Sequence, residues 1–350
     1  MMTLRQCADT PEHIHTATMW YLTDLAEARG KQGLYTKQFP QKLKALREHA
    51  MIESAVSSNR IEGVEVDQSR VGTIMFGRPR LRDRNEIELQ GYRSALNKIH
   101  QRGAELPVSE RTIRELHRLT RGEIWDAGRY KQKDADIIET YPDGGRRVRF
   151  RTVPADKTPH AMSELVELWH ACLRERWVHP LVGLAAFNLD FLCIHPFRDG
   201  NGRVSRLLLL LLCYHLGLEV GRYISLERLI EQNKERYYET LEQSSHGWHQ
   251  GKHDPWCYVN YVLFILKTAY KEFEDRLGQA ASPKGAKADL VIDAIHRQSG
   301  AFRLVDIERA CPGVGREWIR VLLSELRRGG EVECRGKGPA ARWWFVRKSK

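Results

Sequence analysis

The feature that most constrains the fold is a pair of apolar stretches separated by a short polar segment. Residues 181–194 (LVGLAAFNLDFLCI) and residues 207–218 (LLLLLLCYHLGL) are apolar on nearly every side of a helix. A helix that is apolar all round is normally buried, and both stretches are shorter than the roughly 20 apolar residues of a membrane-spanning helix. The sequence therefore predicts two core helices, one over 181–194 and one from about residue 202 to residue 216.

The rest of the chain predicts a mainly α-helical protein of two or three domains. Apolar residues recur at intervals of three and four over much of residues 1–100, and again over 159–175, 227–244 and 254–277. This is the spacing of one helix face, and 350 residues are enough for several domains. We expect an N-terminal helical region over 1–105, a central domain over 106–277 and a C-terminal domain over 288–350.

The segment between the two apolar stretches, His195–Arg203 with the sequence HPFRDGNGR, places polar groups at the junction of two core helices. Gly200 and Gly202 allow backbone N–H groups to approach a ligand closely, and the N-terminus of the next helix is an anion-binding site. Arg203 and Arg206 share one face of that helix and can bind successive phosphates.

Two further groups make this segment suited to phosphoryl or nucleotidyl transfer. Asp199 supplies one carboxylate beside the anion site, which is the usual protein share of a magnesium site completed by phosphate and water. His195 can accept a proton near neutral pH. A base, a metal ligand, an anion site and two arginines together indicate this class of reaction.

Residues 195–203 together with Arg206 resemble the signature of the Fic family, H-P-F-x-(D/E)-G-N-G-R-x-x-R, at every defined position. The resemblance implies a protein adenylyltransferase, in which a Ser, Thr or Tyr hydroxyl of a target protein attacks the α-phosphate of ATP. His195 would take the proton, pyrophosphate would leave, and Asp199 would hold Mg²⁺. The ATP-binding residues that the resemblance implies in this segment are Asp199, Gly200, Asn201, Gly202, Arg203 and Arg206. Self-modification is a further expectation.

An upstream segment, residues 58–63 (SNRIEG), resembles the inhibitory motif of the same family, (S/T)-x-x-x-E-(G/N). Ser58 and Glu62 are four residues apart and share a helix face, and Gly63 suits a helix end. Taken alone, so short a segment is more often an ordinary helix C-terminus than an inhibitory motif. The surrounding EHAMIESAVSSNRIEGVEV also resembles relatives that carry the motif before the catalytic domain, which implies that Glu62 pairs with Arg206 and keeps the γ-phosphate from seating.

A β-hairpin is expected between residues 134 and 153. The stretches DADIIET and RVRFRTV flank a turn rich in Pro, Asp and Gly. The preceding LHRLTRGEIWDAGRYKQ is similar to the helix and turn before the family's flap, whose first strand aligns a target segment by strand addition. Ile137 and Ile138 are candidates for nucleotide or target contacts, or for the ordinary apolar face of a hairpin.

Residues 233–238 (NKERYY) resemble the family segment that packs near the adenine. Tyr237 and Tyr238 would stack on the base, although a tyrosine pair on an amphipathic helix is as often part of a core. The asparagine that the family places beyond this pair corresponds to Ser244 or Ser245, so that contact has no assigned residue. The resemblance as a whole covers roughly residues 40–270.

The C-terminal part of the chain carries most of the net charge. Residues 281–350 contain 15 Lys and Arg against 8 Asp and Glu, an excess of seven within a net charge of +11. A small, polar linker over 278–287 precedes three short amphipathic helices and an alternating segment around a Gly-Lys-Gly-Pro turn. This order is typical of a winged helix-turn-helix, which predicts a DNA-binding or protein-docking module; a solvated basic surface is the alternative.

Three classes of function remain open from the sequence. The first is protein adenylylation, inhibited through Glu62 and Arg206. The second is another reaction on the same scaffold: phosphorylation, transfer of a different nucleotide or phosphocholine, or removal of AMP by water that Glu62 positions. Kinase-like relatives tend to carry Lys at the position of Gly202, which argues against phosphorylation. The third is a nucleotide-sensing DNA-binding regulator, which would be expected to have lost His195 or Asp199.

The cysteines and the first residues favour a cytoplasmic protein. The beginning of the sequence, MMTLRQCADTPEHIHTATMW, lacks the cationic flank and apolar run of a signal peptide. The seven cysteines form no C-x-x-C pair, and an odd, scattered set suits a reducing compartment without structural zinc. We expect no membrane partner, and we leave a homodimer open.

Overall fold

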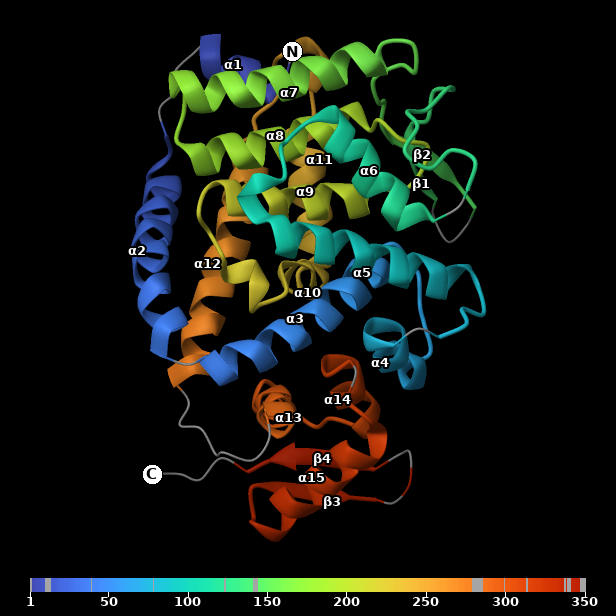
Figure 1. Ribbon diagram of the computed structural model, residues 1–350, viewed down its shortest axis with the longest axis vertical. Coiled ribbons are helices and arrows are strands. Elements are labelled where there is room, and N and C mark those ends of the chain that lie inside the picture. Colours follow the sequence, from blue (N-terminus) through green and yellow to red (C-terminus); the bar gives the residue numbers. More distant parts are fainter. Residues whose placement is uncertain are drawn as a thin grey trace.

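The computed structural model describes residues 2–9, 14–38, 40–77, 79–122, 124–140, 144–278, 286–298, 300–312, 314–336, 338 and 341–346. These residues form a mainly helical protein, as expected, with two short antiparallel hairpins (Figure 1). Among the described helices, none combines the length and apolar character needed to cross a membrane.

A bundle of helices makes up the larger part of the molecule (Figure 1). Its helices are α1 (Thr3–Asp9), α2 (Thr16–Gln38), α3 (Pro40–Ile61), α4 (Gln68–Phe76), α5 (Arg84–Arg102), α6 (Glu110–Arg121), α7 (Thr158–Glu175), α8 (Pro180–Ile194), α9 (Asn201–His215), α10 (Leu226–Gln232), α11 (Lys234–Ser245) and α12 (Trp256–Gly278). Short 3₁₀ turns lie at Gly103–Glu105, Val220–Arg222 and Trp248–Gln250.

The two predicted core helices are confirmed as α8 and α9, each beginning one residue earlier than expected. Nearly every residue of both helices is buried, because α7, α12 and the other helices of the bundle surround them. A single hydrophobic core extends from Met2, just before α1, to Leu277 in α12. The loop between α8 and α9 is therefore attached at both ends to the most rigid part of the protein.

The helical stretch expected over 227–244 is divided at Asn233. This residue has φ −117° and ψ 33°, which interrupts the helix, and its side-chain amide donates to the carbonyl of Leu229 at 2.9 Å. The asparagine thus satisfies the end of α10 while its own carbonyl accepts from the N–H of Tyr237 at the start of α11. This local competition with the helix backbone is characteristic of asparagine.

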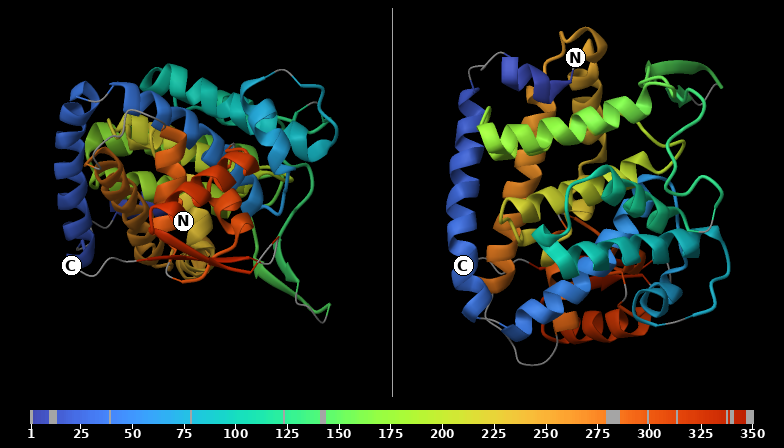
Figure 2. Two further views of the ribbon diagram at one scale, coloured as in Figure 1. Left: turned by 90° about the horizontal axis from the view of Figure 1, so that it is seen from below. Right: turned by 45° about the horizontal axis from the view of Figure 1, so that its top comes forward.

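The expected hairpin is confirmed as β1 (Ile137–Thr140) paired antiparallel with β2 (Arg146–Phe150). It projects from the body of the molecule (Figure 2). Ile138 pairs with Val148, and both side chains are about half exposed. The face on which Val148 lies therefore meets solvent and not a core. Residues 141–143 of the expected turn lie outside the described part of the chain.

The C-terminal residues form α13 (Ala286–His296), α14 (Leu304–Ala310), α15 (Arg316–Arg328), β3 (Val332–Arg335) and β4 (Arg342–Phe345). The three expected helices and the hairpin are present, and Phe302 adds a β-bridge to Trp343. They enclose a second hydrophobic core, separate from the first. Of the expected linker, Gly278 ends α12 and residues 286–287 begin α13, whereas residues 279–285 lie outside the described part. The turn around 336–339 is described only at its two glycines.

Of the C-terminal helices, α13 lies against α3 (Figure 1). Arg60 near the end of α3 donates to the carbonyl of Arg309 at 3.3 Å. Arg297, directly after α13, forms an ion pair with Glu272 in α12 at 3.0 Å. The helix that ends at the candidate inhibitory segment is thus in contact with the C-terminal helices.

Candidate active site

The loop between α8 and α9 presents His195 in an unusual backbone conformation. His195 has φ 53° and ψ 59°, in the left-handed region. This region costs a non-glycine residue about 1 kcal/mol or more. Its N–H donates to the carbonyl of Phe191 at 3.0 Å, which ends α8. Gly200, with φ 83°, then begins α9 at a conformation that suits glycine.

Neighbouring residues hold each part of this loop in place. The backbone N–H of Lys131 donates to the carbonyl of Pro196 at 2.9 Å. The side-chain amide of Asn201 accepts from the N–H of Phe197 at 2.9 Å and donates to its carbonyl at 2.7 Å. The structure therefore places the amide of Asn201 inside the loop, where it fixes the backbone around the buried ring of Phe197.

His117 in α6 is a supporting residue that the sequence did not reveal. Its ring stacks on Phe197 with centroids 3.8 Å apart. Its Nδ1 accepts from the N–H of Gly128 at 2.9 Å, so its Nε2 carries the proton and donates to the carbonyl of Asp199 at 3.0 Å. Burial lowers the pKa of His117 to about 4, which keeps the ring neutral and in this one tautomer.

Glu62 and Arg206 meet as the inhibitory resemblance implied. Nη2 of Arg206 lies 2.8 Å from Oε1 of Glu62. The same guanidinium donates from Nε to Oγ of Ser58 at 2.9 Å and from Nη2 to the carbonyl of Ser58 at 3.0 Å. Gly63, with φ 78°, follows at the end of α3. Arg206 is almost completely buried by these contacts.

The carboxylate of Glu62 also lies against the start of α9. A Cβ atom on Gly202 would come within 2.3 Å of Oε1 of Glu62, so an alanine here could not coexist with the present position of the carboxylate. The N-terminus of a helix attracts anions. Glu62 therefore occupies, as an internal anion, the region where the sequence predicts phosphate.

One cavity of about 270 Å³ brings together most of the predicted residues. The predicted residues that line it are Glu62, Ile137, His195, Gly202, Arg206, Tyr237, Tyr238 and Ser245. The cavity lies between α3, α9, α11 and the β1–β2 hairpin. A base, a buried arginine, an apolar hairpin residue and two tyrosines thus share a space large enough for part of a nucleotide.

The other predicted residues do not all reach this cavity. Ile138 is 53% exposed and lies on the open face of the hairpin. Ser244 is buried, and its hydroxyl accepts from the N–H of Tyr258 at 3.0 Å. Tyr237 lines the cavity but is only 3% exposed, because it packs against Tyr261 and other rings of α12. Tyr238 is the more accessible of the pair and has Arg149 above its ring at 5.5 Å.

The sequence also missed a buried acid, Glu88 in α5, that organises the arginines around α9. Glu88 accepts from Arg203 at 2.8 Å through Oε2, and from Arg121 and Arg84 at 2.9 Å each through Oε1. Arg203 is 2% exposed and is not among the described residues that line the cavity. The one available signal was that Glu88 lies on the apolar stripe of its helix, four residues before the buried Tyr92.

Asp199 fits a single ligand of a nucleotide-bound metal ion. Its Oδ2 lies 2.8 Å from Arg121 and 3.4 Å from Arg84. Burial opposes ionisation, but these arginines and Arg203 lower the pKa of Asp199 below its usual value, so the carboxylate is charged. No group of three or more metal-binding side chains occurs among the described residues. Most ligands of a metal here would have to come from phosphates and water.

Burial and the nearby ammonium of Lys131 lower the pKa of His195 to about 4, while Glu62 and Asp199 act in the opposite direction. The imidazole is therefore neutral at pH 7 and has a lone pair available. A neutral imidazole that opens into a cavity beside an anion-binding helix end can act as a general base.

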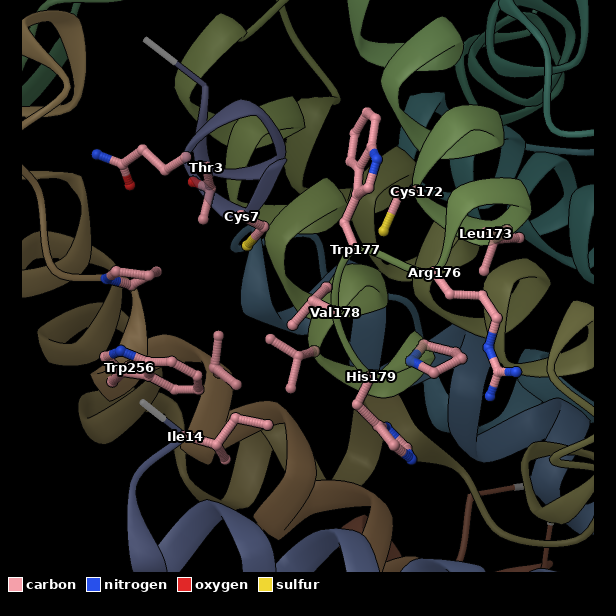
Figure 3. Close-up of a pocket in the computed structure, with 15 residues that line it drawn as sticks. Thr3, Cys7, Ile14, Cys172, Leu173, Arg176, Trp177, Val178, His179 and Trp256 are labelled. Atoms are coloured by element: carbon pink, nitrogen blue, oxygen red, sulfur yellow. The ribbon is translucent and has the colours of Figure 1, made fainter. Parts of the chain in front are cut away.

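A separate cavity of about 330 Å³ lies between α1, the turn that joins α7 to α8, and the start of α12 (Figure 3). Trp177, Trp256 and Ile14 line it. Its histidine, His179, caps α8 by accepting from the N–H of Leu181 at 3.2 Å. None of its described lining residues is a carboxylate or belongs to the α8–α9 loop, so it offers no comparable chemistry.

Comparisons with known proteins agree on a family. Residues 107–213 match the Fic/DOC family. The protein adenylyltransferase Fic of Nematostella vectensis is 25% identical over 215 residues, which cover 58% of this chain and 45% of that protein. The protein of the same name from Drosophila yakuba is 23% identical, over 57% of this chain and 40% of that protein. The chain therefore spans less than half the length of the curated relatives it matches.

Solved structures show the same fold. A Fic family protein from Desulfovibrio desulfuricans superposes with a TM-score of 0.62 at 22% identity, over 98% of this chain and 99% of that chain. A Fic domain containing signaling protein from Bacteroides thetaiotaomicron gives 0.61 at 22% identity, over 74% and 100%. The matched region contains α6, α8, most of α9 and the whole loop that carries His195 and Asp199. Residues 107–213 of the chain therefore match the Fic/DOC family, within a fold that solved Fic proteins share.

Proposed function

We propose that the protein is a protein adenylyltransferase that transfers AMP from ATP to a Ser, Thr or Tyr hydroxyl, and that Glu62 inhibits it. The observation that carries the proposal is the shared cavity. His195, the start of α9 and Arg206 open into it, and Glu62 fills its anion-binding end. The names of the curated relatives support the same reaction class.

The transfer uses groups that this cavity brings together. The hydroxyl oxygen of the target forms a bond to the α-phosphorus, and its proton passes to the imidazole of His195. The bond from the α-phosphorus to the bridging oxygen breaks, and pyrophosphate leaves with that oxygen and its electron pair. Backbone N–H groups at the start of α9 stabilise the phosphate charge.

The residues around the start of α9 also suit a metal-bound nucleotide. Mg²⁺ bound beside Asp199 would neutralise the phosphates and the leaving pyrophosphate. Arg121, which now contacts Asp199, would then have to share or yield that carboxylate. Tyr238 is the proposed contact for the adenine, because it is the more exposed tyrosine of the cavity.

Inhibition follows from the position of Glu62. A carboxylate bound to Arg206 and placed on Gly202 competes for the same groups as the γ-phosphate. Its negative charge also repels the triphosphate. ATP that binds despite Glu62 would present its α-phosphate poorly to the incoming hydroxyl, and misplacement by about 1 Å can cost on the order of 10²-fold in rate.

The decisive test is labelling by the Glu62→Gly variant. The protein is incubated with ATP labelled at the α-phosphate, Mg²⁺ and a cell lysate, and the labelled residue is identified by mass spectrometry. We expect labelling of self or of a target to rise well above the parent, and to fall by about 10²–10⁴-fold when His195→Ala is added. Labelling in a parallel incubation with ATP labelled at the γ-phosphate would instead indicate phosphorylation, and no gain over the parent would contradict inhibition by Glu62.

Removal of AMP is a second candidate, because Glu62 lines the same cavity as His195 and its side chain is 31% exposed. A carboxylate in that position can orient water toward a phosphodiester. The labelled product of the Glu62→Gly variant supplies the substrate for the test. Release of AMP by the parent protein, and not by the Glu62→Gly variant, would establish the second activity.

A further inference from the structure

Lys131, in the segment between α6 and β1, is a buried cation that the proposed reaction does not use. Only 5% of the residue is exposed. Its ammonium donates to the carbonyl of Ile194 at 3.2 Å and to the hydroxyl of Thr152 at 2.7 Å. Its backbone N–H donates to the carbonyl of Pro196 at 2.9 Å. Burial of a lysine is costly unless its charge is used, which raises the question of what this one does.

Two of the three contacts of Lys131 lie on either side of the catalytic base. Ile194 and Pro196 are the residues on either side of His195, and Lys131 binds the carbonyl of each. The carbonyl of Ile194 is one of the last in α8, where no intrahelical partner remains and a cation is favourable. Because the left-handed conformation of His195 persists only when its surroundings fix it, these two hydrogen bonds help to hold the backbone on both sides of the imidazole.

The third contact of Lys131 joins the base to the hairpin. Thr152 follows β2, and its hydroxyl donates to the carbonyl of Ala135 at 3.0 Å, just before β1. Its backbone N–H donates to Oδ1 of Asp136 at 3.3 Å. Thr152 thus holds the two ends of the β1–β2 hairpin together, and Lys131 holds Thr152 to the loop of His195.

We propose that Lys131 is a positioning residue that fixes the β1–β2 hairpin and the catalytic base as one unit. A target segment bound along the hairpin then presents its hydroxyl to an imidazole whose place is already set. This inference rests on the proposed function, because it assigns the hairpin to target alignment. It concerns the relative position of hydroxyl and base and not the binding of nucleotide.

The charge of Lys131 has a second effect on the base. Burial lowers the pKa of Lys131 to about 8, so the ammonium is mostly charged at pH 7. That charge helps to keep His195 neutral, against the opposite influence of Glu62 and Asp199. The remaining charged or titratable groups among the described residues that line the cavity are Arg149, Cys193, Arg206, Tyr237, Tyr238 and Glu242.

The test compares Lys131→Met and Lys131→Arg with the control Lys133→Met, all in the Glu62→Gly background. Lys133 is an exposed lysine two residues away. We expect Lys131→Met to lower kcat by about 10²-fold with little change in KM for ATP. The acid limb of the pH–rate profile should move to higher pH. Lys131→Arg should recover part of kcat, because it keeps the cation and a hydrogen-bond donor. The control Lys133→Met should have the same kcat and KM as the Glu62→Gly protein without it.

Two measurements do not depend on activity. NMR titration of the His195 ring should show a higher pKa in Lys131→Met. Hydrogen exchange of the hairpin amides should be faster both in Lys131→Met and in Thr152→Val, whereas Thr152→Val should leave the pKa of His195 unchanged. If the Glu62→Gly parent transfers nothing from ATP, the proposed function fails, and these two measurements still decide the role of Lys131.

Two results for Lys131→Met would each overturn the proposal. The first is an unchanged pKa of His195 together with unchanged hydrogen exchange of the hairpin amides. The second is equal losses of kcat and of ATP affinity, which would mark a purely structural residue. If Lys131→Met does not fold, Thr152→Val decides: unchanged hairpin exchange in that variant would overturn the proposal, and faster exchange with an unchanged His195 pKa would support it.

Discussion

Arg203 and Arg206 are both almost fully buried, and each is held by a different carboxylate. Arg206 binds Glu62 at the end of α3, whereas Arg203 binds Glu88 in α5. Glu62 is partly exposed and reaches the cavity, but Glu88 is 3% exposed. The sequence predicts the same phosphate-binding role for both arginines, but their surroundings differ. A ligand in the cavity can displace Glu62 from Arg206, whereas the ion pair of Arg203 with Glu88 belongs to the core.

The burial of Glu88 leads to a prediction about stability. Glu88→Gln would remove the carboxylate that pairs with the buried guanidinium of Arg203, and one of the two carboxylates that Arg121 contacts. Loss of one partner of a buried ion pair typically costs about 3–5 kcal/mol. We expect a clear fall in the midpoint of thermal unfolding. Glu105→Gln, at an exposed position after α5, is the matched control, and equal midpoints for the two variants would contradict the structural role of Glu88.

Between elements, one buried carboxylate connects α1 with α8. Asp190 in α8 is fully buried, and its carboxylate accepts from the N–H groups of Thr3 and Leu4 at 2.7 and 3.0 Å. It also accepts from the hydroxyl of Thr3 and from the indole of Trp248, at 2.7 Å each. One side chain of α8 thus anchors both the first helix and the turn before α12.

We therefore expect Asp190→Asn to loosen α1. An amide in this place would direct N–H donors toward groups that are themselves donors, and an unsatisfied buried polar group costs on the order of 1–3 kcal/mol. Urea unfolding should show the loss, and hydrogen exchange should locate it in α1 and near Trp248. Asp254→Asn, which alters an exposed carboxylate that caps α12, is the comparison; a loss no larger than in that variant would be evidence against the anchor.

At the scale of the whole molecule, buried histidines set the response to acid. Burial lowers the pKa of His100 to about 3 and the pKa of His117, His195 and His253 to about 4. The usual value is 6.5, so the unfolded chain takes up these protons first as pH falls. Their contribution to stability is fully present above about pH 6.5 and is lost between that pH and about 4.

We expect the free energy of unfolding to be several kcal/mol lower at pH 5 than at pH 7.5, since each histidine costs about 1.4 kcal/mol for each pH unit in that window. Burial raises the pKa of Asp190 to about 6, which acts in the opposite direction below that pH, but through one group only. Urea titrations at the two pH values measure the difference. His117→Gln should show a smaller pH dependence than the parent, and an unchanged dependence would mean that His117 does not stay neutral.

The C-terminal domain gives a prediction about partners. We propose that it is a winged helix-turn-helix and expect the full chain to bind duplex DNA weakly at low salt, because its excess of seven positive charges attracts phosphates. Binding should fall steeply with salt. In α15, however, Arg316 pairs with Glu308 and Arg320 with Glu317, at 3.2 and 2.6 Å.

The ion pairs of Arg316 and Arg320 lead to a more specific expectation for the DNA titration. Because Arg316 and Arg320 are already neutralised, Arg320→Ala should weaken DNA binding less than a free phosphate-binding arginine would. Trp318 and Val321 are the exposed apolar side chains of the same helix, at 45% and 43%. If no binding appears at low salt, the exposed surface of α15 is a protein-docking surface and the DNA prediction is wrong.

Much of the architecture follows from the sequence because it depends on local pattern. The apolar stretches around residues 195–203 can only be core helices, and the glycines and polar residues between them can only be a loop at their junction. The motif at residues 195–206 by itself predicts the Fic family, and the four-residue spacing of Ser58 and Glu62 predicts that both face the same side at the end of α3. These features are determined by residues close together in the chain.

What the tertiary structure alone decided depends on residues far apart in the chain. Glu88, His117 and Lys131 act on the α8–α9 loop from three separate segments, and no periodicity relates them to it. Whether Arg203 faces a ligand or a buried carboxylate, and whether Ser244 or Ser245 lines the cavity, depends on how helices pack. Packing is set by the sum of many weak contacts across the core. The local sequence therefore determined which residues form the α8–α9 loop, whereas only the tertiary structure decided which charged side chains pair with one another.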